Sequence, residues 1–177
     1  MKLPQSWDQE SGASDRLAVH LQEVVRERDP YGAPVGHAYV QAYVTQQLTG
    51  YGVVTAHQFS HRGRTHQNLV LDLPGQTDRG LVLVGAHYDA VPGSPGADDN
   101  GSALAVLLEL ARAFSTTPAR RPIRLIAFDL EESDRAGSRA YAEDLGELSV
   151  RAALRRGVLR AENSAYGRSY AQCLRAA

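Results

Sequence analysis

The stretch LVLVGAHYDAVPGSPGADDNG, residues 81–101, decides the fold of this chain and the place of its chemistry. It begins with consecutive apolar residues, which predict a strand buried on both faces, at the centre of a sheet covered by helices. It then places His87, Asp89, Asp98 and Asp99 within thirteen residues. The Gly- and Pro-rich segment between them predicts a loop. We therefore expect a functional site where this strand ends.

The segment downstream repeats the arrangement of a strand followed by acidic residues. Residues 101–115, GSALAVLLELARAFS, predict a well-buried helix, and residues 123–130, IRLIAFDL, predict a second buried strand. A helix between two such strands is expected to form a right-handed crossover unit. Residues 128–133, FDLEES, form a second acidic cluster. Because ligands gather at the carboxyl ends of strands in such sheets, both clusters are expected at one site.

The upstream part predicts two helices followed by two strands. The helices cover residues 14–28 and 34–48, where apolar residues recur at helical spacing. The strands cover residues 52–59 and 68–73, and a short last helix is expected over residues 135–145. The predicted fold class is α/β: a three-layer αβα sandwich with a mixed, mostly parallel sheet.

Histidines upstream of the site are not expected to bind metal, because their spacing matches no ligand pattern. We interpret residues 60–67 as the polar, solvated loop of a hairpin. The histidines on the two helices are interpreted as ordinary surface or packed residues. The residues concerned are His20, His37, His57, His61 and His66.

Size and composition limit the classes of protein to which the chain can belong. A chain of 177 residues, 43% hydrophobic and 22% charged, is enough for one α/β domain. The net charge of −1 gives no reason to expect nucleic acid or an anionic membrane as partner. The single cysteine, Cys173, excludes an internal disulfide framework and a cysteine-rich zinc site. Neither a membrane-spanning run nor the apolar region of a signal peptide is visible, so we expect a cytoplasmic protein.

His87 and Asp89 form an H-x-D motif at the end of the predicted strand. Alternation along a strand places the two side chains on one face. An imidazole that binds metal needs its second nitrogen hydrogen-bonded, and Asp89 could supply that bond or could orient a neighbouring catalytic acid. Taken alone, the motif is as typical of a surface His–Asp pair.

The acidic clusters also have simple structural explanations. Asp98 and Asp99 could cap the following helix, and the carboxylates of residues 129–132 could pair with Arg135 and Arg139. Taken together, however, a His, an Asp able to bridge two cations and two adjacent Glu at two strand ends are what two-metal hydrolysis requires. Imidazole as a ligand favours zinc over magnesium.

These motifs resemble the zinc aminopeptidases of the leucyl aminopeptidase, aminopeptidase Y and glutamate carboxypeptidase group, whose fold is similar to that of glutaminyl cyclases. The resemblance covers residues 68–145 and rests on GAHYDAVPGSPGADDNGSA and IRLIAFDLEESDRAGSRAYAEDL. It implies an enzyme that uses two zinc ions to hydrolyse the N-terminal bonds of peptide substrates.

The resemblance also implies a role for each site residue. His87 would bind one zinc ion, Asp99 would bridge both, and Glu132 would bind the second. Glu131 would be the general base and acid, and Asp89 would support catalysis from behind His87. The resemblance further implies a cis peptide bond after Asp99.

Residues 147–177 depart from the family's pattern. They hold six Arg against two acidic residues and no His, and the family's two further ligands, an Asp and a later His, have no counterpart among them. We therefore divide the chain into residues 1–146, the N-terminal part of a catalytic domain, and residues 147–177, an Ala/Arg-rich tail. The tail is either out-of-frame translation, which would truncate the domain near Gly146, or an ordinary basic amphipathic helix.

Truncation would remove one non-bridging ligand from each zinc ion, so we do not expect tightly held zinc, and activity of the chain by itself is doubtful. The loss of a strand and of covering helices would also predict low solubility or instability. Two other functions remain open at this point. One is an inactive remnant or a binding module, and the other is a single-zinc enzyme of the glutaminyl-cyclase type. The intact pair of Glu131 and Glu132 favours the peptidase over the cyclase.

Overall fold

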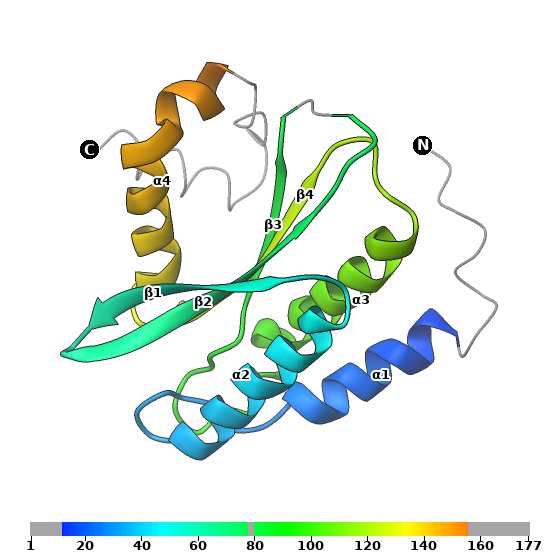
Figure 1. Cartoon of the computed structure of the whole chain (residues 1–177). Coiled ribbons are helices and arrows are strands. Elements are labelled where there is room, and N and C mark those ends of the chain that lie inside the picture. The colour runs from blue at the N-terminus through cyan, green and yellow to red at the C-terminus, as the bar shows by residue number, and fades with distance from the viewer. Residues whose placement is uncertain (1–11, 78–79, 156–177) are drawn as a thin grey trace.

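The computed structural model describes residues 12–77 and 80–155, with side chains up to residue 145. The elements lie in the predicted order, as Figure 1 shows. They are α1 (Ala13–Val24), α2 (Pro34–Thr49), β1 (Val54–His61), β2 (Arg64–Leu73), β3 (Val82–His87), the short irregular turn η2 (Ala97–Gly101), α3 (Ser102–Thr116), β4 (Ile123–Phe128) and α4 (Ala136–Arg155).

The four described strands form one mixed sheet in the order β1-β2-β4-β3. Strands β3 and β4 are parallel and are joined through α3, as the crossover prediction requires. The pairs β1–β2 and β2–β4 are antiparallel. The predicted α/β class with a mixed sheet is therefore confirmed, but "mostly parallel" is wrong for the described sheet. The prediction failed because β2 is as buried as a parallel strand would be, although it is antiparallel to β4.

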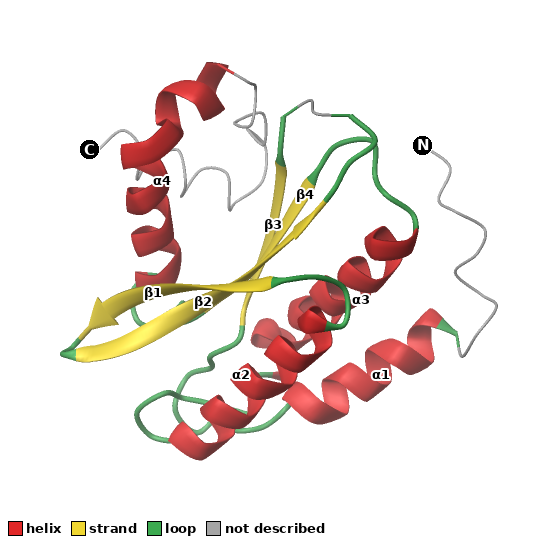
Figure 2. Cartoon of the chain, in the orientation of Figure 1, coloured by secondary structure: helices red, strands yellow, loops and turns green. Residues whose placement is uncertain are grey.

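Helices cover both faces of the sheet, with α1, α2 and α3 on one side and α4 on the other (Figures 1 and 2). Alternate residues of the two central strands point to these two layers. On β4, Leu125 and Ala127 join the core under the three helices, whereas Ile126 and Phe128 join the smaller core that includes Tyr141 of α4. No helix of the described part of the chain is long and apolar enough to cross a membrane.

The predicted loop over residues 60–67 is wrong, because both strands of the hairpin extend through it. Strand β1 ends at His61 and β2 begins at Arg64, so that only two residues form the turn. Both turn residues have positive φ angles, 48° at Arg62 and 72° at Gly63. Such two-residue turns match the twist of the flanking strands. Arginine at the first position is unusual there, which is why the sequence pattern does not reveal the turn.

Helix α4 extends further than the predicted residues 135–145, since it runs to Arg155 without a break at position 147. The proposed division into residues 1–146 and 147–177 stays a prediction, because residues 156–177 lie outside the described residues.

A buried asparagine joins three segments around the end of β4. Asn68 of β2 is fully buried, and its Oδ1 accepts a hydrogen bond from the main-chain N–H of Asp129 at 2.9 Å. Its Nδ2 donates to the carbonyl oxygen of Gly137 in the first turn of α4, also at 2.9 Å. This junction fixes where the chain leaves β4 and where α4 begins.

Substituting Gly137 by Ala is expected to lower the free energy of unfolding by about 1–3 kcal/mol. An added Cβ would lie 2.2 Å from the carbonyl oxygen of Asp129 and 2.5 Å from Asn68 Oδ1, so the junction must open to make room. Urea unfolding followed by circular dichroism measures the loss.

The matched control is Gly12→Ala, where the added Cβ meets only the Asp15 carboxylate, at 3.9 Å. Its expected effect is within about 0.5 kcal/mol. Equal stability of the Gly137 and Gly12 variants would contradict the tight junction.

Candidate metal centre

The parallel pairing of β3 with β4 brings the two predicted clusters together. His87 ends β3 and lies opposite Phe128, the last residue of β4, so the residues that follow each strand share one edge of the sheet. Ligand atoms of His87, Glu131 and Glu132 lie within 4.8 Å of one another. His87 Nε2 also lies 3.0 Å from Asp99 Oδ1. Three of the four side chains expected around the metal therefore form one group, and the fourth, Asp99, adjoins that group through its contact with His87.

Asp89 connects the strand end to the glutamate pair. Its carboxylate is buried and accepts hydrogen bonds from the main-chain N–H groups of Glu131 at 3.0 Å and Glu132 at 3.1 Å. Its Oδ1 lies 3.3 Å from Nδ1 of His87. With Nδ1 facing a carboxylate, Nε2 is the ring nitrogen available to a metal ion. The two alternatives considered for Asp89, supporting the imidazole and orienting a neighbouring acid, are thus both compatible with the geometry.

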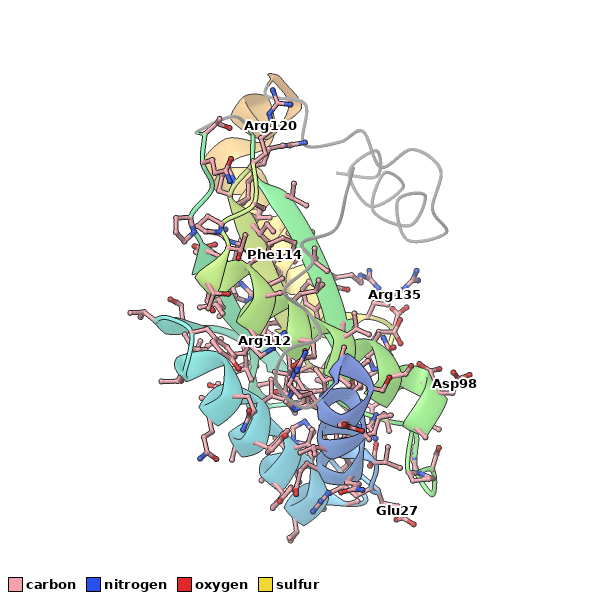
Figure 3. The ribbon with its side chains drawn as sticks, turned by 90° about the vertical axis from the view of Figure 1, so that its right-hand side faces the viewer. Glu27, Asp98, Arg112, Phe114, Arg120 and Arg135 are labelled. Carbon is pink, nitrogen blue, oxygen red and sulfur yellow. The ribbon has the colours of Figure 1, made fainter. Side chains whose placement is uncertain are left out.

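The turn before α3 carries the acidic pair Asp98–Asp99. The Asp99–Asn100 peptide bond is cis, as the family resemblance implies. The Asp99 side chain is 77% exposed and reaches His87, whereas Asp98 is exposed and its carbonyl oxygen accepts a hydrogen bond from Ser102 Oγ at 3.1 Å. In Figure 3 Asp98 and Arg135 mark the segments after β3 and after β4, on the same side of the molecule.

Burial and the charges of neighbouring carboxylates determine the electrostatics of the cluster. Burial raises the pKa of Glu132, and the charge of Asp99 raises it further. Burial alone would lower the pKa of His87, but its hydrogen bond to Asp89 and the charges of Asp89 and Glu131 outweigh burial and raise it. Neighbouring carboxylates at this distance disfavour each other's ionised form. One imidazole nitrogen among several carboxylates is a donor set that fits zinc.

Asp129 is separate from the metal cluster, although it lies only two residues before Glu131. It is fully buried and lies between two histidines, with His37 Nε2 2.7 Å from Oδ1 and His66 Nδ1 3.1 Å from Oδ2. The suggested pairing of this acidic run with arginines therefore does not hold for Asp129. Arg139 pairs with Asp134 instead.

Two of the upstream histidines thus have a buried partner that the sequence does not reveal. His37 is packed, as one of the two interpretations allowed, and His66 is a buried residue of β2 and not part of a solvated loop. Strand β2 is buried at four consecutive positions, residues 68–71, and its alternating leucines lie on the other parity, so no periodicity in the sequence marks His66 as buried. His20 and His57 also have polar partners, since His20 contacts Tyr43 Oη and His57 contacts Asp144. In the described part of the chain, Nε2 of His61 is buried without a hydrogen-bond partner.

The fold and this site define an α/β protein with a carboxylate- and imidazole-rich centre at the carboxyl ends of two parallel strands. The sequence profile of Peptidase family M28 matches residues 68–169, more than half of the chain. The chain therefore belongs to peptidase family M28. The resemblance to zinc aminopeptidases inferred from the motifs is confirmed at this level.

One relative by sequence and two solved structures that share the fold are similar to this chain. Aminopeptidase YwaD of Bacillus subtilis is 48% identical over 71 residues, which are 40% of this chain and 16% of that protein. A zinc-dependent exopeptidase from Parabacteroides distasonis has the same fold, with a TM-score of 0.55 and 24% identity over 70% of this chain and 48% of that one. A glutaminyl cyclase from an Acidobacteriales bacterium has a TM-score of 0.65 and 19% identity, and the match covers 88% of this chain and 59% of that one. The chain spans less than two thirds of each of these proteins.

Proposed function

We propose that this chain carries a zinc site of the aminopeptidase type, which removes N-terminal residues from peptides. In this proposal His87 would bind one zinc ion, Asp99 would be shared by two and Glu132 would bind the second. The observation that carries the proposal is the convergence of His87, Glu131 and Glu132 within 4.8 Å at the ends of two parallel strands. Membership of peptidase family M28 supports the reaction class.

When bound, zinc supplies a Lewis acid that polarises the scissile carbonyl and lowers the pKa of an attacking water molecule. The chain's own contribution to proton transfer is Glu131, whose carboxylate takes the proton from the water and delivers it to the leaving amine. Asp89 accepts a hydrogen bond from the main-chain N–H of Glu131 and so fixes the backbone position from which the Glu131 side chain extends. In this division of roles, Glu132 binds the metal and the adjacent Glu131 transfers the proton.

Zinc added to chelator-treated protein is expected to bind and to raise the melting temperature. At a free zinc concentration of 100 Kd the stabilisation amounts to roughly 2.7 kcal/mol. Replacing His87 by Ala should weaken zinc binding by more than about 100-fold, the upper end for residues that only orient metal ligands, because it removes the nitrogen ligand itself. Isothermal titration gives the affinity and the stoichiometry, for which we expect two zinc ions per chain.

The control for this experiment is His57→Ala, because His57 contacts Asp144 of α4 and Asn68 and lies outside the cluster. Zinc binding that is equal in the His87 and His57 variants would reject the proposed ligand set. Release of the aniline from a leucyl anilide by the zinc-loaded protein tests the reaction itself. Zinc binding without hydrolysis would keep the metal site and reject the peptidase activity for this chain.

A further inference from the structure

A fully buried arginine lies behind the metal centre. Arg28 follows α1, is 0% exposed and donates hydrogen bonds to five main-chain carbonyl oxygens. Nε donates to the carbonyl oxygen of Tyr88 at 2.9 Å, and Nη2 donates to that of Gly96 at 2.8 Å. Nη1 is the donor in the other three hydrogen bonds. Among the described residues, no carboxylate accepts a hydrogen bond from it. The remaining acceptors are the carbonyl oxygens of Val24, Arg26 and Pro95.

The positions of these acceptors explain the choice of an arginine. Tyr88 lies between His87 and Asp89, and Gly96 lies three residues before Asp99. One planar guanidinium therefore joins the strand end that carries the imidazole to the turn that carries the bridging carboxylate. Only arginine presents five donors in a rigid fork, so a single side chain can hold both segments at a fixed separation.

The turn around Gly96 is shaped to this contact. Gly96 has φ +55°, and a Cβ at this position would lie 2.6 Å from both Arg28 Nη2 and the carbonyl oxygen of Asp99. The carbonyl oxygen of Gly96 also accepts a hydrogen bond from the N–H of Gly101, at 3.0 Å, which closes the turn. The guanidinium, the glycine and the turn are therefore one packed unit.

Charge gives a second reason for placing a cation here. Burying an unpaired guanidinium is costly, and burial lowers the pKa of Arg28. The nearby charges of Asp89, Asp99 and Glu132 oppose that effect. Arg28 thus lies in the field of these carboxylates, and among the described residues it donates its hydrogen bonds to main-chain carbonyl oxygens and not to the oxygens of Asp99 or Glu132.

We propose that Arg28 is a positioning residue of the metal centre, which sets the separation between His87 and Asp99 by holding the main chain of both segments. This inference rests on the proposed function, because it assigns Arg28 a role toward the zinc ligands. It adds a residue from the far N-terminal part of the chain, which neither the motifs nor the matched range of the family profile contains.

The decisive variant is Arg28→Lys, which keeps the positive charge but loses the planar guanidinium with its five hydrogen-bond donors. We expect it to weaken zinc affinity about 10–100-fold, the range typical when a residue that orients metal ligands is replaced. Competition with a chromophoric chelator measures the affinity. Cobalt(II) in place of zinc should show an altered visible absorption spectrum, because that spectrum follows the arrangement of the ligands.

Arg124→Lys is the matched control, since the Arg124 side chain donates hydrogen bonds to Asp72 of β2 and Tyr141 of α4, and none of these printed bonds reaches a residue of the metal centre. Its zinc affinity and cobalt spectrum are expected to match the wild type. A folded Arg28→Lys protein with wild-type affinity and spectrum overturns the proposal. If that variant does not fold, Gly96→Ala disturbs the same contact from the other side, and wild-type metal binding by it has the same consequence.

Amide hydrogen exchange separates this inference from the proposed function. In metal-free protein the N–H of Gly101 reports the turn directly, and Arg28→Lys should speed its exchange while Arg124→Lys should not. A wild-type protein that binds no zinc would reject the proposed function and, with it, the role of Arg28 toward metal. Exchange at Gly101 unchanged by Arg28→Lys would reject the contact itself, whatever the zinc result.

Discussion

Replacing Glu131 by Gln is expected to slow hydrolysis of a leucyl anilide by roughly 10²–10⁴-fold, the usual contribution of a general base or acid. Gln has nearly the same size and keeps an oxygen near the cluster, but it cannot accept the proton. The main chain at this position is held by Asp89 through the N–H of residue 131, so the substitution leaves the backbone in place. Initial rates with saturating zinc, measured for wild type and variant, give the ratio.

Two comparisons make the result specific to proton transfer. Glu143→Gln changes an exposed glutamate of α4 and should leave the rate unchanged. Zinc uptake by the Glu131 variant, followed by titration, separates a loss of metal from a loss of the base. Equal rates for wild type and the Glu131 variant, each with zinc bound, would reject the role given to Glu131.

Replacing Asp129 by Ala is expected to lower the free energy of unfolding by about 3 kcal/mol, the lower end of the range for removing one partner from a buried ion pair. Asp129 is fully buried and serves both His37 and His66, so its loss leaves two ring nitrogens without their partner. Urea unfolding monitored by circular dichroism measures the change.

The control for Asp129 is another ion pair that is exposed. Asp72→Ala removes a carboxylate that is 57% exposed and pairs with Arg124 at 2.6 Å. Exposed pairs contribute at most about 1 kcal/mol, so this variant should remain close to the wild type. An Asp129 variant as stable as the Asp72 variant would show that the buried pair contributes little.

The metal cluster was accessible from the sequence because its residues follow patterns that are local in the chain. An apolar run followed by His87 and Asp89, and a second run followed by Glu131 and Glu132, place both groups at strand ends. Parallel pairing of the two strands then brings them together without further information. The residues that support the cluster follow no such rule. The Arg28–Tyr88 contact spans 60 residues, and His37 and His66 lie 92 and 63 residues from Asp129.

The errors about the sheet have a similar physical origin. Burial along β2 and β4 is read from apolar residues, and burial does not distinguish a parallel from an antiparallel neighbour. The polar residues on both sides of the Arg62–Gly63 turn likewise suggested a loop, because strand positions that face water carry the same side chains as loops do. Direction and register come from turn geometry and from packing across the sheet, which a single sequence expresses weakly.

The hydrogen bonds from the main chain of the glutamate pair to Asp89 have a consequence for how this site can evolve. Asp89 accepts hydrogen bonds from the main-chain N–H groups of Glu131 and Glu132, not from their side chains. The position of the backbone therefore does not depend on which side chains residues 131 and 132 carry. A point substitution at either position can therefore exchange the reactive group while the backbone keeps its course. A site built in this way can acquire a new chemistry, or lose its own, without first losing its architecture.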